Sequence, residues 1–264
     1  MSITAIHSQF VRITYGIFAA VALTSVVIPA LILLVFVPTR IGRRRVARWG
    51  ARLFFMLIGS PVRLEGAHEL PTSPCVVVAN HASYLDGIML TAALPPSFTF
   101  LIKHEMSTFP FAGFLLRRIG SEFVDRGNNS HRHRVARRLF KAAETGDALA
   151  FFPEGTFDAA PGLRRFQPGA FSAAWRAELP VVPIVISGSR AKLPAGSWLC
   201  SPGPLAIRVC APIDPATHAS ASELLQASRQ AMLKWLDEPD LALDERQSGP
   251  ESLSGVSVQA GGGP

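Results

Sequence analysis

The chain has 264 residues, of which 48% are hydrophobic and only 17% are charged, and its mean hydropathy is +0.28. This length holds one substantial domain with an anchoring segment and leaves no room for a second large core, while the composition favours membrane contact. The net charge of +7 suits an anionic partner, either a phospholipid surface, a phosphorylated substrate or a nucleic acid. Cys75, Cys200 and Cys210 lack CxxC spacing, so we expect buried thiols in a reducing compartment rather than a disulfide framework or a zinc site.

The first element is an apolar run at residues 17–37, which carries no charge and is interrupted only by Thr24, Ser25 and Pro29. At about 1.5 Å per residue, a helix of this length reaches across the ~30 Å hydrocarbon core of a bilayer. A helical hairpin that enters one leaflet is the alternative, because Pro29 could break the helix. We therefore expect an anchor over residues 1–60, either a membrane helix or a helical hairpin.

A cluster of arginines follows the apolar run, whereas only Arg12 precedes it. Under the positive-inside rule, this asymmetry predicts that the domain after the run lies on the cytosolic side of a bacterial-type inner membrane. Residues 42–59 combine these charges with apolar positions and predict a basic amphipathic helix at the membrane interface. The arginines of the cluster are Arg40, Arg43, Arg44, Arg45, Arg48 and Arg52.

From residue 61 onward, short β-rich runs alternate with helical patterns, which predicts an α/β domain over residues 61–237 with helices covering its sheet. The remaining residues, 238–264, are rich in Gly, Ser and Pro and are predicted to form a disordered tail. The expected strands are residues 62–65, 75–79, 98–102, 122–124, 148–152, 181–186 and 205–209. The expected helices are residues 85–94, 109–119, 132–145, 169–177 and 222–236.

The most informative polar residues, Asn80, His81, Ser83 and Asp86, directly follow the apolar strand at residues 75–79. Active sites of α/β proteins collect at strand ends. His81 and Asp86 are five positions apart, about 140° around a continuous helix, so they meet only if a turn lies between them. Ser83 predicts that turn as a helix N-cap, with Asp86 completing an S-x-x-D capping pattern.

Two interpretations of this pair are open on the residues alone. In the first, Asp86 only caps a helix and His81 is a loop histidine. In the second, a carboxylate oxygen of Asp86 also accepts from one nitrogen of His81, and the other nitrogen takes a proton from an alcohol. The sequence has no G-x-S-x-G nucleophile elbow, so the second interpretation makes a hydroxyl of the substrate the nucleophile.

The order of four motifs resembles the glycerolipid acyltransferase family, whose members acylate lysolipids such as 1-acylglycerol-3-phosphate. Its HxxxxD motif matches His81 and Asp86, and the blocks Gly-Ser-Glu-Phe-Val-Asp-Arg, Phe-Pro-Glu-Gly-Thr and Val-Pro-Ile follow at residues 120–126, 152–156 and 182–184. The resemblance covers about residues 62–212. It implies a mixed, largely parallel sheet and the transfer of a fatty acyl group from an acyl thioester to the free hydroxyl of a lysolipid.

The resemblance also implies roles for individual residues. His81 would be the general base and Asp86 the residue that orients it, while the acceptor most consistent with the family is 1-acylglycerol-3-phosphate, which would yield phosphatidic acid. No bound cofactor is implied, because the donor is a cosubstrate, either acyl-coenzyme A or an acyl-acyl carrier protein. The residues expected at the acceptor's polar head are Asn80, Ser83, Arg126, Glu154, Gly155, Thr156, Arg164 and Arg165.

Two positions depart from the family's pattern. Phe157 stands where many members have an arginine after the threonine, and Gln167 stands where many have a lysine. Arg164 and Arg165 are close enough in sequence to replace these charges. The departures keep a second acceptor, lyso-ornithine lipid or another lysolipid, open.

The remaining charged motifs are given simpler interpretations. Residues 131–133 read His-Arg-His, a spacing that directs the two imidazoles apart, so no metal site is expected. The arginine-rich residues 132–138 are a candidate contact for lipid head groups or acyl carrier protein, or a solvated face. No nucleic-acid-binding module is present in the sequence and no oligomeric state is indicated. A noncatalytic lipid-binding membrane protein is the alternative function of a different class.

Overall fold

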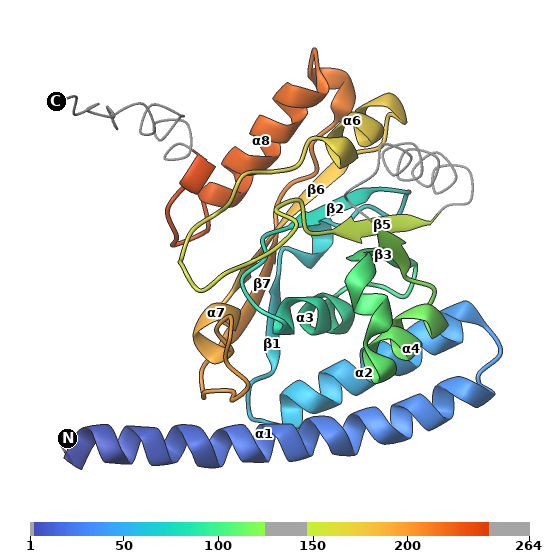
Figure 1. The fold of residues 1–264 in the computed structure, drawn as a ribbon. Helices are drawn as coiled ribbons and strands as arrows, with labels where there is room; N and C mark the ends of the chain where they lie inside the picture. Colours follow the sequence, from blue (N-terminus) through green and yellow to red (C-terminus); the bar gives the residue numbers. More distant parts are fainter. Residues whose placement is uncertain (1–2, 125–146, 243–264) are drawn as a thin grey trace, which may run out of the picture.

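The protein, described here from a computed structural model, has defined structure at residues 3–124 and 147–242, and its described strands form a seven-stranded sheet (Figure 1). The strand order is β1-β7-β6-β2-β5-β3-β4. Neighbouring strands are parallel except β6 and β7, which are antiparallel. This confirms the mixed, largely parallel sheet. The strands are β1 Val62–Glu65, β2 Val76–Ala79, β3 Phe98–Lys103, β4 Glu122–Val124, β5 Ala148–Phe151, β6 Val181–Ser187 and β7 Leu205–Val209.

All seven strands lie within one residue of their predicted bounds, and the helices that cover them were also expected, except the short α7. The predicted helix at residues 132–145 lies outside the described part of the chain. The α-helices of the described part are α1 Ile3–Phe36, α2 Arg40–Leu57, α3 Leu85–Ala93, α4 Pro110–Arg118, α6 Gly169–Arg176, α7 Ser189–Lys192 and α8 Ala221–Leu233. Short 3-10 turns lie at Ala67–Glu69, His104–Thr108 and Pro215–Thr217.

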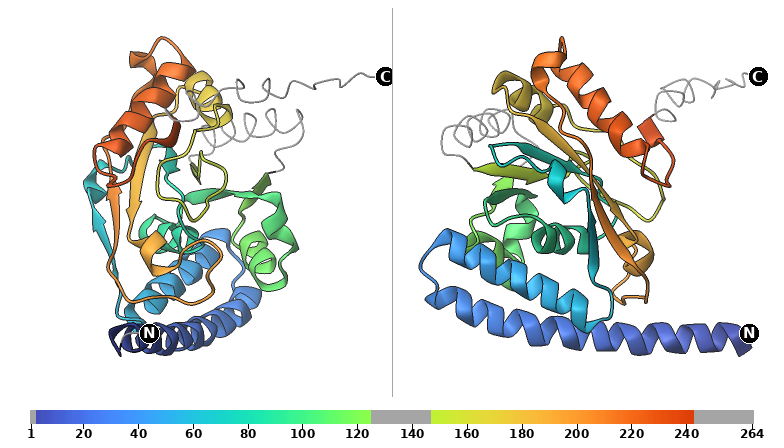
Figure 2. Two further views of the ribbon diagram at one scale, coloured as in Figure 1. Left: turned by 60° about the vertical axis from the view of Figure 1, so that its left-hand side comes forward. Right: turned by 180° about the vertical axis from the view of Figure 1, so that it is seen from behind.

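Both faces of the sheet are covered, which places β2 at the centre of the core. Val77 and Ala79 pack toward α2 and α3, whereas Val76 and Val78 pack toward α6 and α8. The two helical layers lie on opposite sides of the sheet in Figures 1 and 2. Because successive side chains of a strand point to opposite faces, the continuous apolar run of β2 follows from burial on both sides.

The predicted anchor, called the anchor below, is a hairpin of two long helices, with α1 running beneath α2 along one edge of the molecule (Figure 2). Helix α1 continues unbroken past Pro29, so the break that this residue could introduce, which was one of two alternatives, does not occur. The turn lies instead at residues 37–39, between the two helices. Val26 and Ala30 pack against Gly50 of α2 on either side of Pro29, and this packing supports the helix where the proline removes a hydrogen bond.

Two arginines of α2 bind the domain, which the sequence did not indicate. Arg48 and Arg52 donate to the carbonyls of Ala92 and Ala93, at the end of α3. Carbonyls at a helix C-terminus lack partners within the helix and carry partial negative charge, so guanidinium groups are favourable there. Arg48 and Arg52 therefore contact the domain, while Arg45 is exposed, and the position of this helix at a membrane interface stays a prediction.

Arg44 is the most deeply buried of these arginines, with 6% of its surface exposed. Its guanidinium donates to the carbonyls of Pro96, Ser97 and Ile119 and to Thr99 Oγ1. A buried cation is tolerated where its donors are hydrogen-bonded. Arg44 therefore joins α2 to the start of β3 and to the end of α4, so the anchor and the domain share one polar contact region.

The C-terminal boundary of the folded part lies further along than predicted. Glu238 forms an ion pair with Arg190, and Asp240 forms one with Arg229. Leu163 pairs with Asp240 through a β-bridge. Residues 238–242 are thus part of the fold and not of the predicted tail, and the rest of that tail, residues 243–264, lies outside the described residues.

Candidate active site

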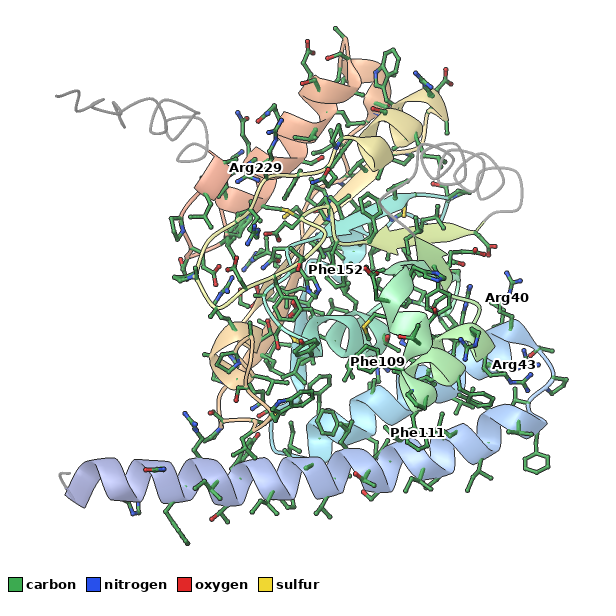
Figure 3. All side chains as sticks on the ribbon, in the orientation of Figure 1. Arg40, Arg43, Phe109, Phe111, Phe152 and Arg229 are labelled. Atoms are coloured by element: carbon green, nitrogen blue, oxygen red, sulfur yellow. The ribbon has the colours of Figure 1, made fainter. Side chains whose placement is uncertain are left out.

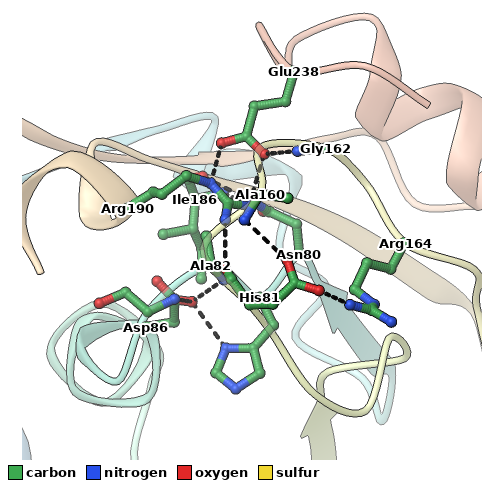
Figure 4. Close-up of polar contacts among 12 residues, drawn as sticks. Asn80, His81, Ala82, Asp86, Ala160, Gly162, Arg164, Ile186, Arg190 and Glu238 are labelled. Carbon is green, nitrogen blue, oxygen red and sulfur yellow. Dashed lines mark hydrogen bonds and ion pairs between the residues drawn. The ribbon is translucent and has the colours of Figure 1, made fainter. Parts of the chain in front are cut away.

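The site is built on a turn at residues 80–86, called the His81 turn below, which leads from β2 into α3 (Figure 4). Asn80 fixes the start of the turn, because its side chain donates to the carbonyl of Ile186 (3.0 Å) and accepts from the amide of Ile186 (2.7 Å). This pair joins the end of β2 to β6. Asn80 is only 3% exposed, so it holds the turn rather than the polar head of an acceptor.

His81 and Asp86 meet across the turn. Asp86 Oδ2 lies 2.9 Å from His81 Nδ1, and it also accepts from the amides of Ala82 (2.6 Å) and Ser83 (2.8 Å). Asp86 is fully buried, whereas 17% of the His81 side chain is exposed. Because a carboxylate oxygen only accepts, this contact requires the hydrogen on Nδ1 and leaves Nε2 with a lone pair.

Ser83 holds the turn from the other side. Its hydroxyl donates to the carbonyl of Leu193 (2.8 Å) and accepts from the amide of Leu85 (3.2 Å). The N-cap position of α3 is Tyr84 and not Ser83, one residue later than predicted. Asp86 nevertheless accepts from the Ser83 amide, as the predicted capping pattern requires. Ser83 is fully buried, so it too supports the turn rather than facing an acceptor.

Glu154 connects the His81 turn to the following loop. Its Oε1 accepts from the amide of His81 (2.7 Å) and its Oε2 from the amide of Arg164 (2.8 Å). Burial raises the pKa of Glu154 to about 7, against the two amides, which favour the charged form. Both oxygens are used within the protein, so Glu154 positions His81 rather than holding an acceptor.

Gly155 and Thr156 form the turn that follows. Gly155 has φ +85°, a conformation that favours glycine, and its amide donates to the carbonyl of Phe152 (3.2 Å). Thr156 is exposed. Of the residues predicted for an acceptor, Thr156 is therefore one of the few whose side chain is open to solvent beside the His81 turn.

Two phenylalanines enclose the His81 ring. Phe152 stacks on it with ring centroids 4.1 Å apart, and Phe157 meets it edge-on at 4.4 Å. Phe157 also packs edge-on against Tyr84 at 4.8 Å. The sequence marked Phe157 only as a departure from the family, and no pattern indicated that it contacts His81. These contacts fix the plane of the imidazole.

The arginines near the site are largely engaged with protein groups. Arg164 forms an ion pair with Asp158, and Arg190 forms one with Glu238 while also donating to the carbonyl of Asp158. Arg165 is exposed. Arg126, predicted to contact the polar head, lies outside the described residues. Arg165 is thus the described member of the predicted set whose guanidinium is open to an anionic ligand.

Other chemistry finds little support in the described residues. Cys75, Cys200 and Cys210 are buried, as predicted. Burial raises the pKa of Cys75 and Cys210 to about 11, so both thiols are protonated and poorly nucleophilic at neutral pH. In residues 3–124 and 147–242, no three His, Cys, Asp or Glu side chains gather as a possible metal site.

The chain is similar to known acyltransferases. The family described as Acyltransferase matches residues 61–187. A 1-acyl-sn-glycerol-3-phosphate acyltransferase of Haemophilus influenzae is 30% identical over 183 residues, which cover 67% of this chain and 72% of that protein. A lyso-ornithine lipid O-acyltransferase of Pseudomonas aeruginosa is 36% identical over 152 residues, covering 58% of this chain and 57% of that protein.

The chain belongs to this acyltransferase family. The crystal structure of a 1-acyl-sn-glycerophosphate acyltransferase from Thermotoga maritima has the same fold, with a TM-score of 0.70 at 21% identity, over 92% of this chain and 98% of that one. The two polar blocks that flank the His81 ring in this acyltransferase, residues 80–86 and 152–157, both lie within the matched region.

The buried carboxyl of Glu154 gives this acyltransferase a testable pH dependence. The pKa of Glu154 is raised to about 7 in the folded protein. Between pH ~4.5 and ~7, Glu154 therefore keeps a proton in the folded state that it has lost in the unfolded state. The free energy of unfolding consequently falls as the pH rises through this window. We expect the melting temperature of wild type, minus that of Glu154→Gln, to become smaller from pH 5 to pH 8. Glu178→Gln, at an exposed glutamate, is the matched control. A difference that stays constant or becomes larger would contradict a raised pKa of Glu154.

Proposed function

We propose that the protein transfers a fatty acyl group from an acyl thioester to the free hydroxyl of a lysolipid, with His81 as general base and Asp86 orienting it. The observation that carries this proposal is the 2.9 Å contact between His81 Nδ1 and Asp86 Oδ2. It directs the Nε2 lone pair away from the carboxylate, toward the partly exposed side of the ring. The family membership supplies the reaction class.

The proton transfers follow from this arrangement. His81 Nε2 removes the proton from the acceptor hydroxyl as its oxygen attacks the thioester carbonyl carbon. The tetrahedral intermediate collapses, the C–S bond breaks, and the imidazolium returns its proton to the leaving thiolate. Asp86 stabilises the imidazolium, as the buried carboxylate does in a serine-protease triad. The carrier of the thioester is either coenzyme A or acyl carrier protein.

For the acceptor we propose 1-acylglycerol-3-phosphate, which yields phosphatidic acid. The relatives from Haemophilus influenzae and Thermotoga maritima carry this activity in their names. Arg165, together with Arg126 of the preceding block, is the candidate for the phosphate, since guanidinium groups bind phosphate through two parallel hydrogen bonds.

We further propose that α1 and α2 anchor the enzyme in the cytosolic leaflet of a bacterial-type inner membrane. Residues 9–36 are apolar and long enough to cross a bilayer. However, the 34 residues of α1 extend about 51 Å, and both its halves bind the domain, through Tyr15 to Lys192 and through the Leu34 carbonyl to Arg118. A helix held at both halves lies along the domain instead of projecting from it, which favours insertion into one leaflet.

Exposed apolar side chains continue from α1 onto the neighbouring helices. Arg118, at the end of α4, donates to α1, and the exposed Phe109 and Phe111 lie at this helix (Figure 3). An exposed apolar surface of this extent is typical of membrane contact. Its most exposed members on α1 and α2 are Phe10, Ile17, Phe18, Val21, Ile28, Ile32, Val35, Phe36, Trp49 and Met56.

The proposed mechanism predicts the effect of removing either member of the pair. We expect His81→Ala and Asp86→Asn each to lower kcat by about 10²–10⁴-fold, because a positioned general base contributes this much. The measurement is mass spectrometry of the ester product, with lysophosphatidate and an acyl thioester as substrates. His68→Ala, at an exposed histidine, is the control and should retain full activity.

The same assay separates the enzyme from a noncatalytic lipid-binding protein. If the wild-type protein retains lysolipid but forms no ester with either thioester carrier, the noncatalytic alternative is correct. If ester forms equally well with His81→Ala, the assignment of the base is wrong.

A lyso-ornithine lipid is the second candidate acceptor, and two observations favour it. The relative from Pseudomonas aeruginosa is named for this activity, although the chain covers only 57% of that protein. Phe157 places an apolar ring against His81, where many relatives have an arginine. A head group without a phosphomonoester needs no cation at this position.

Phe157 should therefore influence which head group is accepted. We expect Phe157→Arg to raise the ratio of kcat/KM for lysophosphatidate to that for lyso-ornithine lipid by about tenfold, the value of one charge-assisted hydrogen bond. Phe157→Leu is the matched control, because it keeps an apolar side chain. A folded Phe157→Arg enzyme with an unchanged ratio would show that residue 157 does not contact the head group.

A further inference from the structure

Lys192 is a buried lysine that the proposed reaction does not use. It is the last residue of α7 and is fully buried, and its ammonium donates to Tyr15 OH (2.9 Å) and to the carbonyls of Ser201 and Gly203 (both 3.1 Å). All three of its donors are thus used. No ion pair with a carboxylate joins Lys192 in the described residues. Burying an ammonium is costly unless it is fully hydrogen-bonded, so this arrangement depends on every partner being in place.

Tyr15 belongs to the anchor helix α1 and connects Lys192 to the rest of the anchor. Its ring lies against the ammonium, with the nitrogen 5.0 Å from the ring centroid. Its hydroxyl donates to the carbonyl of Ile58, directly after α2, and contacts Ser60 Oγ at 3.3 Å. The ammonium, the phenol and the end of α2 thus form one continuous polar contact in an otherwise apolar region.

A second contact, independent of the lysine, holds the same loop to α1. A Cβ atom placed on Gly16 would lie 2.9 Å from two atoms of Leu199 and 3.3 Å from the carbonyl of Cys200. Only glycine allows this approach of helix and loop without a shift. The segment that begins at Lys192 is therefore packed tightly on α1 at two consecutive residues, Tyr15 and Gly16.

The other end of this connection is the His81 turn. Leu193, the residue after Lys192, accepts the hydrogen bond from Ser83 Oγ (2.8 Å). Ser83 in turn donates its amide to Asp86 Oδ2, the oxygen that contacts His81. Two adjacent residues, Lys192 and Leu193, thus lie between the anchor helix and the carboxylate that orients the histidine.

We propose that Lys192 is a positioning residue that connects the anchor helix α1 to the His81 turn. Docking of α1 through Tyr15 fixes the backbone at Lys192 and Leu193, and the Leu193 carbonyl fixes Ser83 and, through it, the Asp86 contact. The effect on catalysis rests on the proposed function, whereas the effect on the turn does not. The anchor then has a role beyond membrane attachment, because it holds the geometry of the histidine.

The test compares Lys192→Met and Tyr15→Phe with wild type in full-length, detergent-solubilised enzyme. Hydrogen exchange of the peptide that covers residues 80–87 is measured first. We expect exchange of the Ala82 and Ser83 amides to become about tenfold faster in both variants, because local opening of the turn becomes easier. Lys234→Met, at an exposed lysine after α8, is the matched control and should exchange as wild type.

The kinetic measurement distinguishes positioning from substrate contact. We expect Tyr15→Phe and Lys192→Met to lower kcat about tenfold or more, with KM for the lysolipid within about twofold of wild type, because a misplaced catalytic group affects the chemical step.

Unchanged exchange and unchanged kcat in Tyr15→Phe, which keeps the ring, would overturn the proposal even if Lys192→Met fails to fold. A change confined to KM would also overturn it. Absence of ester formation by wild type would refute the proposed function and leave the exchange result as the test of the connection.

Discussion

One oxygen of Asp86 holds the active-site geometry together. It accepts from His81 Nδ1 and from the amides of Ala82 and Ser83, so the same atom starts the turn and orients the imidazole. The remaining contacts of the site act on this centre: Asn80 ties the turn to β6, Glu154 holds the His81 amide, and Phe152 stacks on the ring. A single carboxylate can serve both roles because it has several acceptor sites.

Buried cations connect the domain to its anchor. Arg44 and Lys192, both buried, donate mainly to backbone carbonyls at the ends of strands, helices and loops. Orphan carbonyls at such ends need donors, and a long basic side chain reaches them while its stem stays among apolar groups. These buried basic residues therefore contribute to the fold, because they hold the N-terminal helices against the domain. The domain and its two N-terminal helices are one structural unit.

The sequence predicted the elements well and the side-chain roles less well. The strands were predictable because buried, β-branched runs alternate with helical patterns, and the four ordered motifs indicated the family. The direction of Arg48 and Arg52 was not predictable, because their partners are carbonyls some forty residues away. For the same reason, Glu154 was assigned to an acceptor, although both its oxygens bind backbone amides of distant residues. Contacts between residues far apart in sequence leave no local pattern.

The tautomer of His81 tests the central claim most directly. Nitrogen-15 NMR of histidine-labelled enzyme in detergent, with His81→Gln to identify the signals, reports which ring nitrogen carries the hydrogen. For the neutral form of the ring, the contact with Asp86 predicts the hydrogen on Nδ1 and a free Nε2 in the substrate-free enzyme, and a loss of this preference in Asp86→Asn. A wild-type His81 with its hydrogen on Nε2 would contradict the account, because that nitrogen could not then accept the proton of the acceptor hydroxyl.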